Sequence, residues 1–599
     1  MAIRLRRSHF AVRFEISEFM MFGTAFGRLS RLLLVGVLAL GLQAPALAQA
    51  PGARLGGGGD VVGYGSIHHP TIGRGGMVTA QSKLAAEIGA QILRQGGNAV
   101  DAAVAVGFAE TMTLPRAGNI GGGGYMLIYD AKSRTTTAIE YYGQAPLATT
   151  PDLLPPSGGG GPDASLSFRG VTVPGTVAGL YEAHRRFGKL PWAKLVQPTI
   201  DLAAKGMVMT DDEAQSLAER REVLSRDAEA RRIYFKADGS PYRPGEIFKN
   251  PDLVWTLKHI QRRGADGFYR GPVAERVVAG VRAGGGIMSL EDLAGYQANV
   301  LEPIWSTYRG YSIAYMPPTS AASSVAEAMN ILEHFPMADY PWGGAQSMHL
   351  IAEALKIASF DRRYSGGGPQ WRTPAAGLAS KAFAAERAKL ISMDRTLDAA
   401  LPPLDPHDYE SPDTTHYSVA DKDGNVVSNT YTLSASFGAH VVAPGTGFLL
   451  NNSMGNFDWG GRGQSLGNKP EPGKRAQSTI SPVIVFKDGK PWLVTGTPGG
   501  GTILSTMVHV LVNVIDYGLN VAEAVQRPRF SQSGPNAPMQ IETAVPQDLV
   551  PALEAKGHRV ERSQIIGSTQ SIVLGEDGLF YGAADTRRPG AAAVGVTMY

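Results

Sequence analysis

The stretch TTHYSVADKDGNVVSNTYTL, residues 414–433, consists of two β-rich arms on either side of the dipeptide Asp423-Gly424. Asp-Gly is a preferred centre for a tight hairpin turn. Counting outward along the antiparallel arms from this turn sets Thr415 opposite Thr432, give or take one residue. The pattern therefore predicts a hairpin in which Thr432 lies beside the start of the first arm.

A proline-rich segment, residues 401–413, comes directly before this hairpin. Its four prolines exclude a helix or an inner strand, because proline lacks the backbone N–H that both structures use. The segment ends at Asp413, so Thr414 opens the first β arm. It is either an ordinary surface loop or a linker that is cleaved between Asp413 and Thr414.

Cleavage at that point would place Thr414 at a chain N-terminus. There its own α-amine, with a pKa of about 7.7 to 8.0, can act as the general base for the threonine hydroxyl, so that no histidine is needed. The hydroxyl of Thr432 could then orient that amine. The alternative is that both residues are ordinary strand threonines.

A glycine-rich turn, Pro498-Gly499-Gly500-Gly501, follows the apolar run 492–494 and precedes an apolar helical pattern that begins near Thr502. Backbone N–H groups at a helix N-terminus are unpaired, and glycine lets a ligand approach them closely. The turn is therefore a candidate oxyanion site, with a plain strand-to-helix turn as the alternative. A phosphate loop is excluded because no Lys-Ser/Thr pair follows the glycines.

Other chemistries have weaker support. The chain holds no cysteine, which excludes disulfides, thiolate metal sites and a cysteine nucleophile. The motif Gly463-Gln464-Ser465-Leu466-Gly467 lacks the strand and helix that a serine nucleophile elbow requires. The 12 histidines are scattered without a metal-binding spacing, so neither a metal nor a cofactor is predicted.

Composition places the chain among globular proteins, with 43% hydrophobic and 18% charged residues in 599. The net charge of +3, without a basic run beyond the N-terminus, argues against a nucleic-acid partner. Arg28 and Arg31 precede an apolar run at 32–42 and the small residues near Ala48, which is typical of a secretory signal over residues 1–48. The alternative is an uncleaved anchor, and the long basic prelude leaves Met20 or Met21 as an alternative start to Met1. We expect no membrane span after signal removal, and a periplasmic or secreted protein.

The rest of the chain alternates between helical and strand-rich blocks. Residues 83–107 show helical spacing interrupted at 96–98, and residues 125–141 show a hairpin pattern. The middle third, about 175 to 400, is dominated by amphipathic helical patterns. From about 414 onward the pattern is mainly β arms around Asp-Gly turns, which predicts a layered α+β architecture.

These motifs together resemble the γ-glutamyltranspeptidase family. The resemblance covers nearly everything after the signal, and it extends beyond residues 414–433 to further motifs. These are GNAVDAAVA (97–105), NIGGGG (119–124), VPGTVAG (173–179), LLNN (449–452), SP (481–482), TPGG (497–500), DYGLNVAEA (516–524) and GSTQ (567–570).

The resemblance implies a four-layer αββα sandwich of the N-terminal-nucleophile hydrolase type, made as a zymogen that cuts itself before Thr414. It implies a large subunit, 49–413, and a small catalytic subunit, 414–599, which form one intertwined domain and a heterodimer of the chain's own fragments. The implied partners are a small amide or peptide substrate and an amine or peptide acceptor. No cofactor is implied.

Matching positions carry the family's roles over to this sequence. Thr414 would attack the amide, Thr432 would position Thr414, and Gly499 and Gly500 would stabilise the oxyanion. Ser478 and Thr479 match the serine pair that holds the substrate α-carboxylate.

Three positions depart from the family pattern. Tyr142 stands where the family has an arginine that grips the α-carboxylate, Asn456 replaces an aspartate that binds the α-amino group, and Ser434 replaces an asparagine. Loss of one charge-assisted hydrogen bond costs about 1.5 to 3 kcal/mol. Both charges of a γ-glutamyl head group therefore lose their usual partners.

The expected activity is cleavage of a γ-glutamyl-type amide of the glutathione class through a threonyl acyl-enzyme, with transfer to water or an amine. The alternative is a glutaryl- or cephalosporin-acylase-like amidase of the same family, because such acyl groups have no free amine to bind. A non-catalytic exported binding protein is a further alternative, disfavoured because Thr414, Thr432 and the glycine turn occur together.

Overall fold

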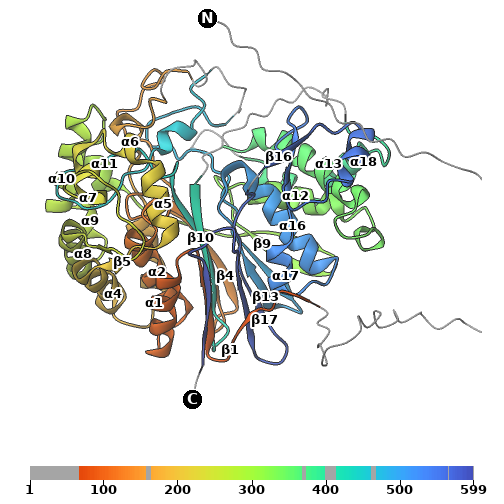
Figure 1. Ribbon diagram of the computed structural model, residues 1–599, viewed down its shortest axis with the longest axis horizontal. Helices are drawn as coiled ribbons and strands as arrows, with labels where there is room; N and C mark the ends of the chain where they lie inside the picture. Colours follow the sequence, from red (N-terminus) through yellow and green to blue (C-terminus); the bar gives the residue numbers. More distant parts are fainter. Residues whose placement is uncertain are drawn as a thin grey trace, which may run out of the picture. The chain divides into compact units, whose positions relative to one another are not determined.

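Two seven-stranded antiparallel sheets face each other in the computed structural model, and helices cover the outer face of each sheet (Figure 1). The structure describes residues 66–156, 163–366, 373–397, 413–460, 467–563 and 565–597. The predicted signal, the proline-rich residues 401–412 and the serine of the Gly463–Gly467 motif lie outside these residues. So do the side chains of Asp413 and Thr414.

The first sheet contains the hairpin at residues 413–434. Its strand order combines segments that precede and follow the proline-rich linker, and every neighbouring pair is antiparallel. In spatial order its strands are β19 (Ala592–Val596), β2 (Gly76–Ala80), β10 (Asp413–Asp421), β11 (Val426–Ser434), β3 (Gly123–Asp130), β4 (Thr135–Glu140) and β7 (Asn299–Leu301).

The second sheet is also built from both parts of the chain. In spatial order its strands are β1 (Thr71–Gly73), β18 (Phe580–Ala584), β17 (Gln570–Leu574), β13 (Lys490–Thr495), β12 (Val483–Lys487), β9 (Tyr311–Tyr315) and β8 (Ile304–Tyr308). Two small sheets lie outside the sandwich: β14 (Phe530–Ser531), β15 (Met539–Glu542) and β16 (Val560–Ser563) form one, and β5 (Met207–Val208) and β6 (Ile247–Phe248) form the other.

The helical layer on the first sheet begins with the two helices expected on either side of residues 96–98. Asn98 caps the second of these, α2, through a reciprocal capping box with Asp101. Every residue of α2 is buried, because it lies between β10 and β11 on one side and other helices on the other. Helices in this part of the chain are α1 (Lys83–Arg94), α2 (Ala99–Thr113), α3 (Thr176–Phe187), α4 (Trp192–Lys205), α5 (Asp211–Glu219), α6 (Arg221–Leu224), α7 (Ala228–Tyr234), α8 (Pro251–Arg263), α9 (Asp266–Tyr269), α10 (Pro272–Ala283) and α11 (Leu290–Gly295).

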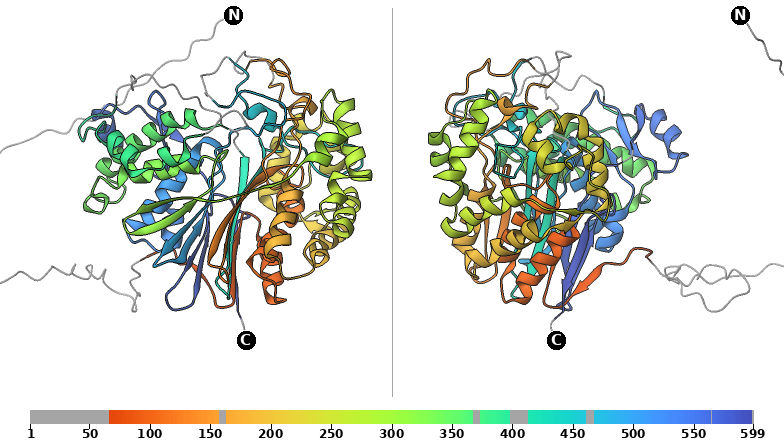
Figure 2. Two further views of the ribbon diagram at one scale, coloured as in Figure 1. Left: turned by 180° about the vertical axis from the view of Figure 1, so that it is seen from behind. Right: turned by 60° about the vertical axis from the view of Figure 1, so that its left-hand side comes forward.

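The opposite helical layer covers the second sheet, as the rear view in Figure 2 also shows. Helices α12 and α17 contact the strands, while α13 and α16 pack beside α12. Helices of this part are α12 (Ala322–Leu332), α13 (Ala345–Asp361), α14 (Ala375–Leu378), α15 (Lys381–Ala388), α16 (Ile503–Ile515), α17 (Val521–Gln526) and α18 (Leu549–Ala555). The predicted αββα sandwich is confirmed. Among the described residues, no helix is long and apolar enough to cross a membrane.

The β10–β11 hairpin has a register one residue from the centre of the prediction. Thr415 pairs with Tyr431 rather than Thr432, because the turn has three residues and is closed by a hydrogen bond from Asp421 N to Asn425 O at 3.1 Å. Gly424 adopts a φ of 90° in this turn, as the last position of a three-residue loop requires. The difference lies within the predicted margin of one residue.

Candidate active site

The backbone of Thr414 lies at an irregularity in the β10–β11 ladder. Below it Thr415 pairs with Tyr431, whereas Asp413 pairs with Ser434, so the register shifts across position 414. This bulge places Thr414 opposite the segment of β11 that contains Thr432. The Thr432 side chain is buried, and its hydroxyl accepts a hydrogen bond from the backbone N of Ser434 at 2.8 Å.

His416, two residues from Thr414, is held as a neutral imidazole. Burial lowers its pKa to about 3. Ser418 donates to the carbonyl of Gln570 at 2.9 Å, so it accepts from His416 Nε2, which leaves Nδ1 to accept from Thr430 Oγ1 at 2.8 Å. Both ring nitrogens therefore take part in hydrogen bonds, with Ser418 and with Thr430.

The glycine turn lies against this end of β10. A Cβ on Gly496, just after β13, would come within 2.4 Å of the His416 ring, so the turn that follows starts beside the hairpin. Gly499 and Gly500 adopt φ values of 132° and 54°, and a Cβ on Gly499 would lie 2.5 Å from Thr502 Oγ1. Thr502 donates to the Gly499 carbonyl through its backbone N at 3.0 Å and its hydroxyl at 2.8 Å. Position 499 therefore requires glycine, and the left-handed φ of Gly500 also favours it.

The side chains of four predicted binding residues lie together: Tyr142, Ser434, Asn456 and Ser478. Asn456 donates to the Tyr142 hydroxyl through Nδ2 at 2.6 Å and accepts from Ser434 Oγ through Oδ1 at 2.8 Å. The hydroxyls of Ser478 and Ser453 are further hydrogen-bonding neighbours of Tyr142. We call these five residues the head-group cluster. Burial raises the pKa of Tyr142, and the side chains that bond to its hydroxyl are all neutral.

Thr479 is the one predicted binding residue that stands apart from these contacts in what the structure describes. Its side chain is partly exposed, and its carbonyl accepts from Ser481 Oγ at 3.0 Å. Ser478, by contrast, is buried, and its backbone N donates to the carbonyl of Thr319 at 3.0 Å. Thr479 therefore lies next to the head-group cluster along the chain without a described bond to it.

Sequence reasoning missed Ser453 and Glu110. Ser453 shows no distinguishing pattern in the sequence. Glu110 is a charged residue type within the apolar run of α2, and a carboxyl group in such a run could have been singled out from the sequence. Burial raises the pKa of Glu110 to about 8, while the hydroxyls of Thr415 and Tyr431 lower it and the nearby Glu213 raises it. A neutral acid group therefore lies directly behind the start of β10.

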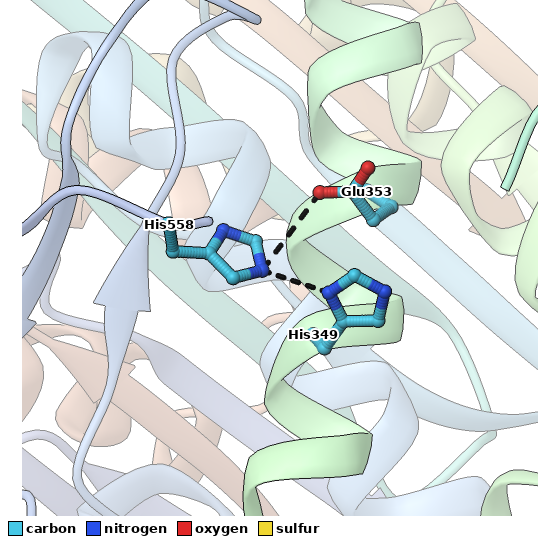
Figure 3. Close-up of side chains that lie close together, drawn as sticks. All are labelled: His349, Glu353 and His558. Carbon is cyan, nitrogen blue, oxygen red and sulfur yellow. Dashed lines mark hydrogen bonds and ion pairs between the residues drawn. The ribbon is translucent and has the colours of Figure 1, made fainter. Parts of the chain in front are cut away.

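A second cluster of titratable side chains is formed by His349 and Glu353 of α13 and by His558, which follows α18 (Figure 3). His349 Nδ1 and His558 Nε2 are 2.8 Å apart, and the other nitrogen of His349 bonds to the Ser392 carbonyl at 2.8 Å. Glu353 forms a buried ion pair with Lys356 at 2.9 Å. Because an ammonium group already neutralises the carboxylate, we interpret the cluster as a hydrogen-bond network that joins α13 to the segments around residues 392 and 558, and not as a cation site.

The fold and site together define a class. Two facing antiparallel sheets between helical layers, with a threonine at the start of a central strand beside a glycine turn, are the features of an N-terminal-nucleophile hydrolase. The sequence model of the Gamma-glutamyltranspeptidase family matches residues 85–595. The chain belongs to this family, and it is an enzyme of the γ-glutamyltransferase type.

Individual relatives agree with that assignment. The glutathione hydrolase proenzyme of Escherichia coli (strain K12) is 41% identical over 547 residues, which cover 88% of this chain and 93% of the relative. The acylase ACY 1 proenzyme of Pseudomonas sp. (strain V22) is 37% identical over 535 residues, covering 87% and 94%. Among solved structures, the cephalosporin acylase from Bacillus halodurans has a TM-score of 0.79 at 28% identity, with 90% of this chain and 99% of that chain covered.

The family, the fold and the enzymatic nature expected from sequence are thereby confirmed. Glutathione hydrolases and acylases both occur among the relatives, so the two acyl-group hypotheses both keep a counterpart. The roles assigned to individual residues, and the cleavage point, stay predictions.

Proposed function

We propose that this protein is exported with removal of residues 1–48 and cuts itself between Asp413 and Thr414. The fragments 49–413 and 414–599 then remain together as a periplasmic or secreted heterodimer. The position of β10 supports this proposal, because it pairs with β2 of the first fragment and β11 of the second. Cleavage would free an N-terminal threonine while leaving its strand bonded on both sides.

The freed Thr414 acts as the nucleophile. Its hydroxyl oxygen forms a bond to the amide carbonyl carbon, and its proton passes to the α-amine and from there to the departing amine. The backbone N–H groups of Gly499 and Gly500 stabilise the oxyanion, and Thr432 positions Thr414. Water or an acceptor amine then takes the acyl group from the threonyl ester. The observation that carries this assignment is the glycine turn that follows Gly496, which packs against His416 two residues from the bulge at position 414.

The substrate is an amide of the γ-glutamyl type, the class to which glutathione belongs. The glutathione hydrolase relatives support this class. The head-group cluster lies at the end of β11, two residues beyond Thr432, where an acyl chain bound to Thr414 would place its far end. Ser434, Asn456, Ser478 and Tyr142 then contact the head group, and Thr479 lies at its edge.

One observation favours a second candidate, an acylase that prefers glutaryl-type groups. Asn456 and Tyr142 bond to each other at 2.6 Å, so an entering head group meets neutral, mutually satisfied side chains. A substrate ammonium buried against neutral groups keeps most of its desolvation cost. A glutaryl group carries no ammonium, and it avoids that cost.

Two experiments test these proposals in turn. Intact-mass analysis of the purified protein is expected to show two fragments divided before Thr414, and the Thr414→Ala variant is expected to remain one chain. A wild-type protein that stays full length would refute the self-cleavage.

The acyl group is then decided by kcat/KM for γ-glutamyl-p-nitroanilide and glutaryl-p-nitroanilide on the same preparation. If the neutral cluster governs selection, wild type prefers the glutaryl compound, and Asn456→Asp shifts the ratio toward the γ-glutamyl compound by about ten- to a hundredfold. Asn456→Leu is the uncharged control. A strong wild-type preference for the γ-glutamyl compound would refute the second candidate and leave the first.

A further inference from the structure

A buried chain of polar side chains lies behind the head-group cluster. It begins at the ion pair between Arg475 and Glu140, whose Nη1 and Oε2 atoms are 2.9 Å apart. Asn299 donates a second bond to the same Glu140 oxygen at 2.7 Å. Glu140 and Arg475 are 4% and 8% exposed, so the carboxylate is held in one place inside the protein.

Thr319 is hydrogen-bonded to this fixed carboxylate. Its hydroxyl donates to Glu140 Oε1 at 2.8 Å. A threonine hydroxyl has a single proton, so its oxygen must be the acceptor in the 2.7 Å contact with the Tyr125 hydroxyl. The fixed carboxylate therefore sets the direction of both bonds, and Thr319 is itself 4% exposed.

Thr319 is connected to the head-group cluster by two sets of contacts. The ring of Tyr125 stacks on that of Tyr142, with centroids 5.4 Å apart and planes inclined by 18°. The carbonyl of Thr319 accepts from the backbone N of Ser478 at 3.0 Å. Thr319 thus contacts Ser478 itself and also Tyr125, the ring that packs on Tyr142. It therefore reaches two members of the cluster that lie far apart in sequence.

We propose that Thr319 is a positioning residue that sets the distance between Tyr142 and Ser478, and so determines how tightly the acyl head group is held. This inference rests on the proposed function, because it concerns the same cluster. Without the Thr319 hydroxyl, Tyr125 loses its acceptor and Glu140 loses a donor, and both are buried. Tyr142 and Ser478 can then move relative to each other, and a misplacement of about 1 Å in a binding site costs up to a hundredfold in rate.

The test compares Thr319→Val, which removes the hydroxyl at nearly equal volume, with Thr319→Ser, which keeps it. On the preferred anilide we expect kcat/KM to fall about ten- to a hundredfold in Thr319→Val, mainly through KM, and to stay within about threefold of wild type in Thr319→Ser. Self-cleavage involves Asp413 and Thr414 rather than the cluster, so both variants are expected to process completely.

A folded, processed Thr319→Val enzyme with wild-type kcat/KM would overturn the inference, as would a Thr319→Ser enzyme that is equally impaired. If Thr319→Val does not fold, Tyr125→Phe disrupts one of the two sets of contacts alone and is expected to raise KM in the same direction; an unchanged KM would overturn the inference. Failure of the proposed function looks different, because wild type would then turn over neither anilide. The same variants, assayed on whichever amide wild type accepts, would still decide the role of Thr319.

Discussion

Glu110 offers a stability prediction whose size follows from its environment. The residue lies in the fully buried helix α2 behind β10, and burial raises its pKa to about 8 from an ordinary value of 4.5. At neutral pH it is therefore protonated in the folded protein and ionised in the unfolded one. Unfolding at pH 7 releases this proton, so the free energy of unfolding is lower at pH 7 than at a pH where both states are protonated.

The sign and the magnitude follow from linkage. Because the pKa of Glu110 is raised in the folded state, the contribution of this residue to stability is fully present below pH 4.5 and is lost as the pH rises to about 8. Each pH unit in that window costs about 1.4 kcal/mol. Between pH 5 and pH 8 the loss amounts to about 3 to 4 kcal/mol.

The substitution Glu110→Gln removes this loss, because glutamine has the shape of the protonated acid and does not ionise. Urea unfolding is measured on single-chain protein carrying Thr414→Ala, so that one molecule unfolds rather than two fragments. The difference in unfolding free energy between Glu110→Gln and its parent is expected to rise by about 3 to 4 kcal/mol from pH 5 to pH 8.

Other groups also titrate in this range, so the comparison uses the difference between variant and parent. The exposed Glu554→Gln on α18 serves as a matched control for the chemical change itself. A difference for Glu110→Gln that stays constant from pH 5 to pH 8 would show that the carboxyl is not held neutral behind β10.

Three further predictions concern the active site. Gly499→Ala is expected to abolish turnover of either anilide, because its Cβ would lie 2.5 Å from Thr502 Oγ1 at a φ of 132°; substantial residual kcat would contradict the fixed-turn argument. Thr432→Val is expected to lower kcat at least tenfold while Thr432→Ser keeps most of it, as steady-state assays can check, and equal loss in both would exclude the hydroxyl as the cause. Tyr142→Arg is expected to lower KM for acyl groups that carry an α-carboxylate, relative to Tyr142→Phe, and identical KM values would argue that position 142 does not contact the head group.

Much of the fold could be predicted from local pattern. The Asp-Gly hairpin at residues 414–433, the capped helix after Asn98 and the turn at Gly499 each depend on residues close together in the chain, where propensity and hydrogen-bonding rules apply directly. The exact register of the hairpin depended on whether its turn has two or three residues. Both turn lengths are common in hairpins, so the sequence pattern predicted the register only to within one residue.

What sequence reasoning missed depends on contacts between distant segments. Glu353 and His558 approach each other from positions about two hundred residues apart, and no spacing rule covers such a pair. The same holds for Thr319, which contacts Tyr125 and Glu140 from 194 and 179 residues away. Family resemblance identified Tyr142 and Asn456 as departures, while their bond to each other became visible in three dimensions alone.

The pairing of β10 on both edges has a consequence for the proposed two-fragment form of the enzyme. Before the cut, every contact between the two halves forms within one chain, and loop closure costs little because the halves are tethered. After the cut, the same contacts can be regained only by a bimolecular encounter of two incomplete sheets with exposed edges. Unfolding of the proposed two-fragment form would therefore be effectively one-way, and its lifetime would be governed by the rate at which the sandwich first opens rather than by an equilibrium constant.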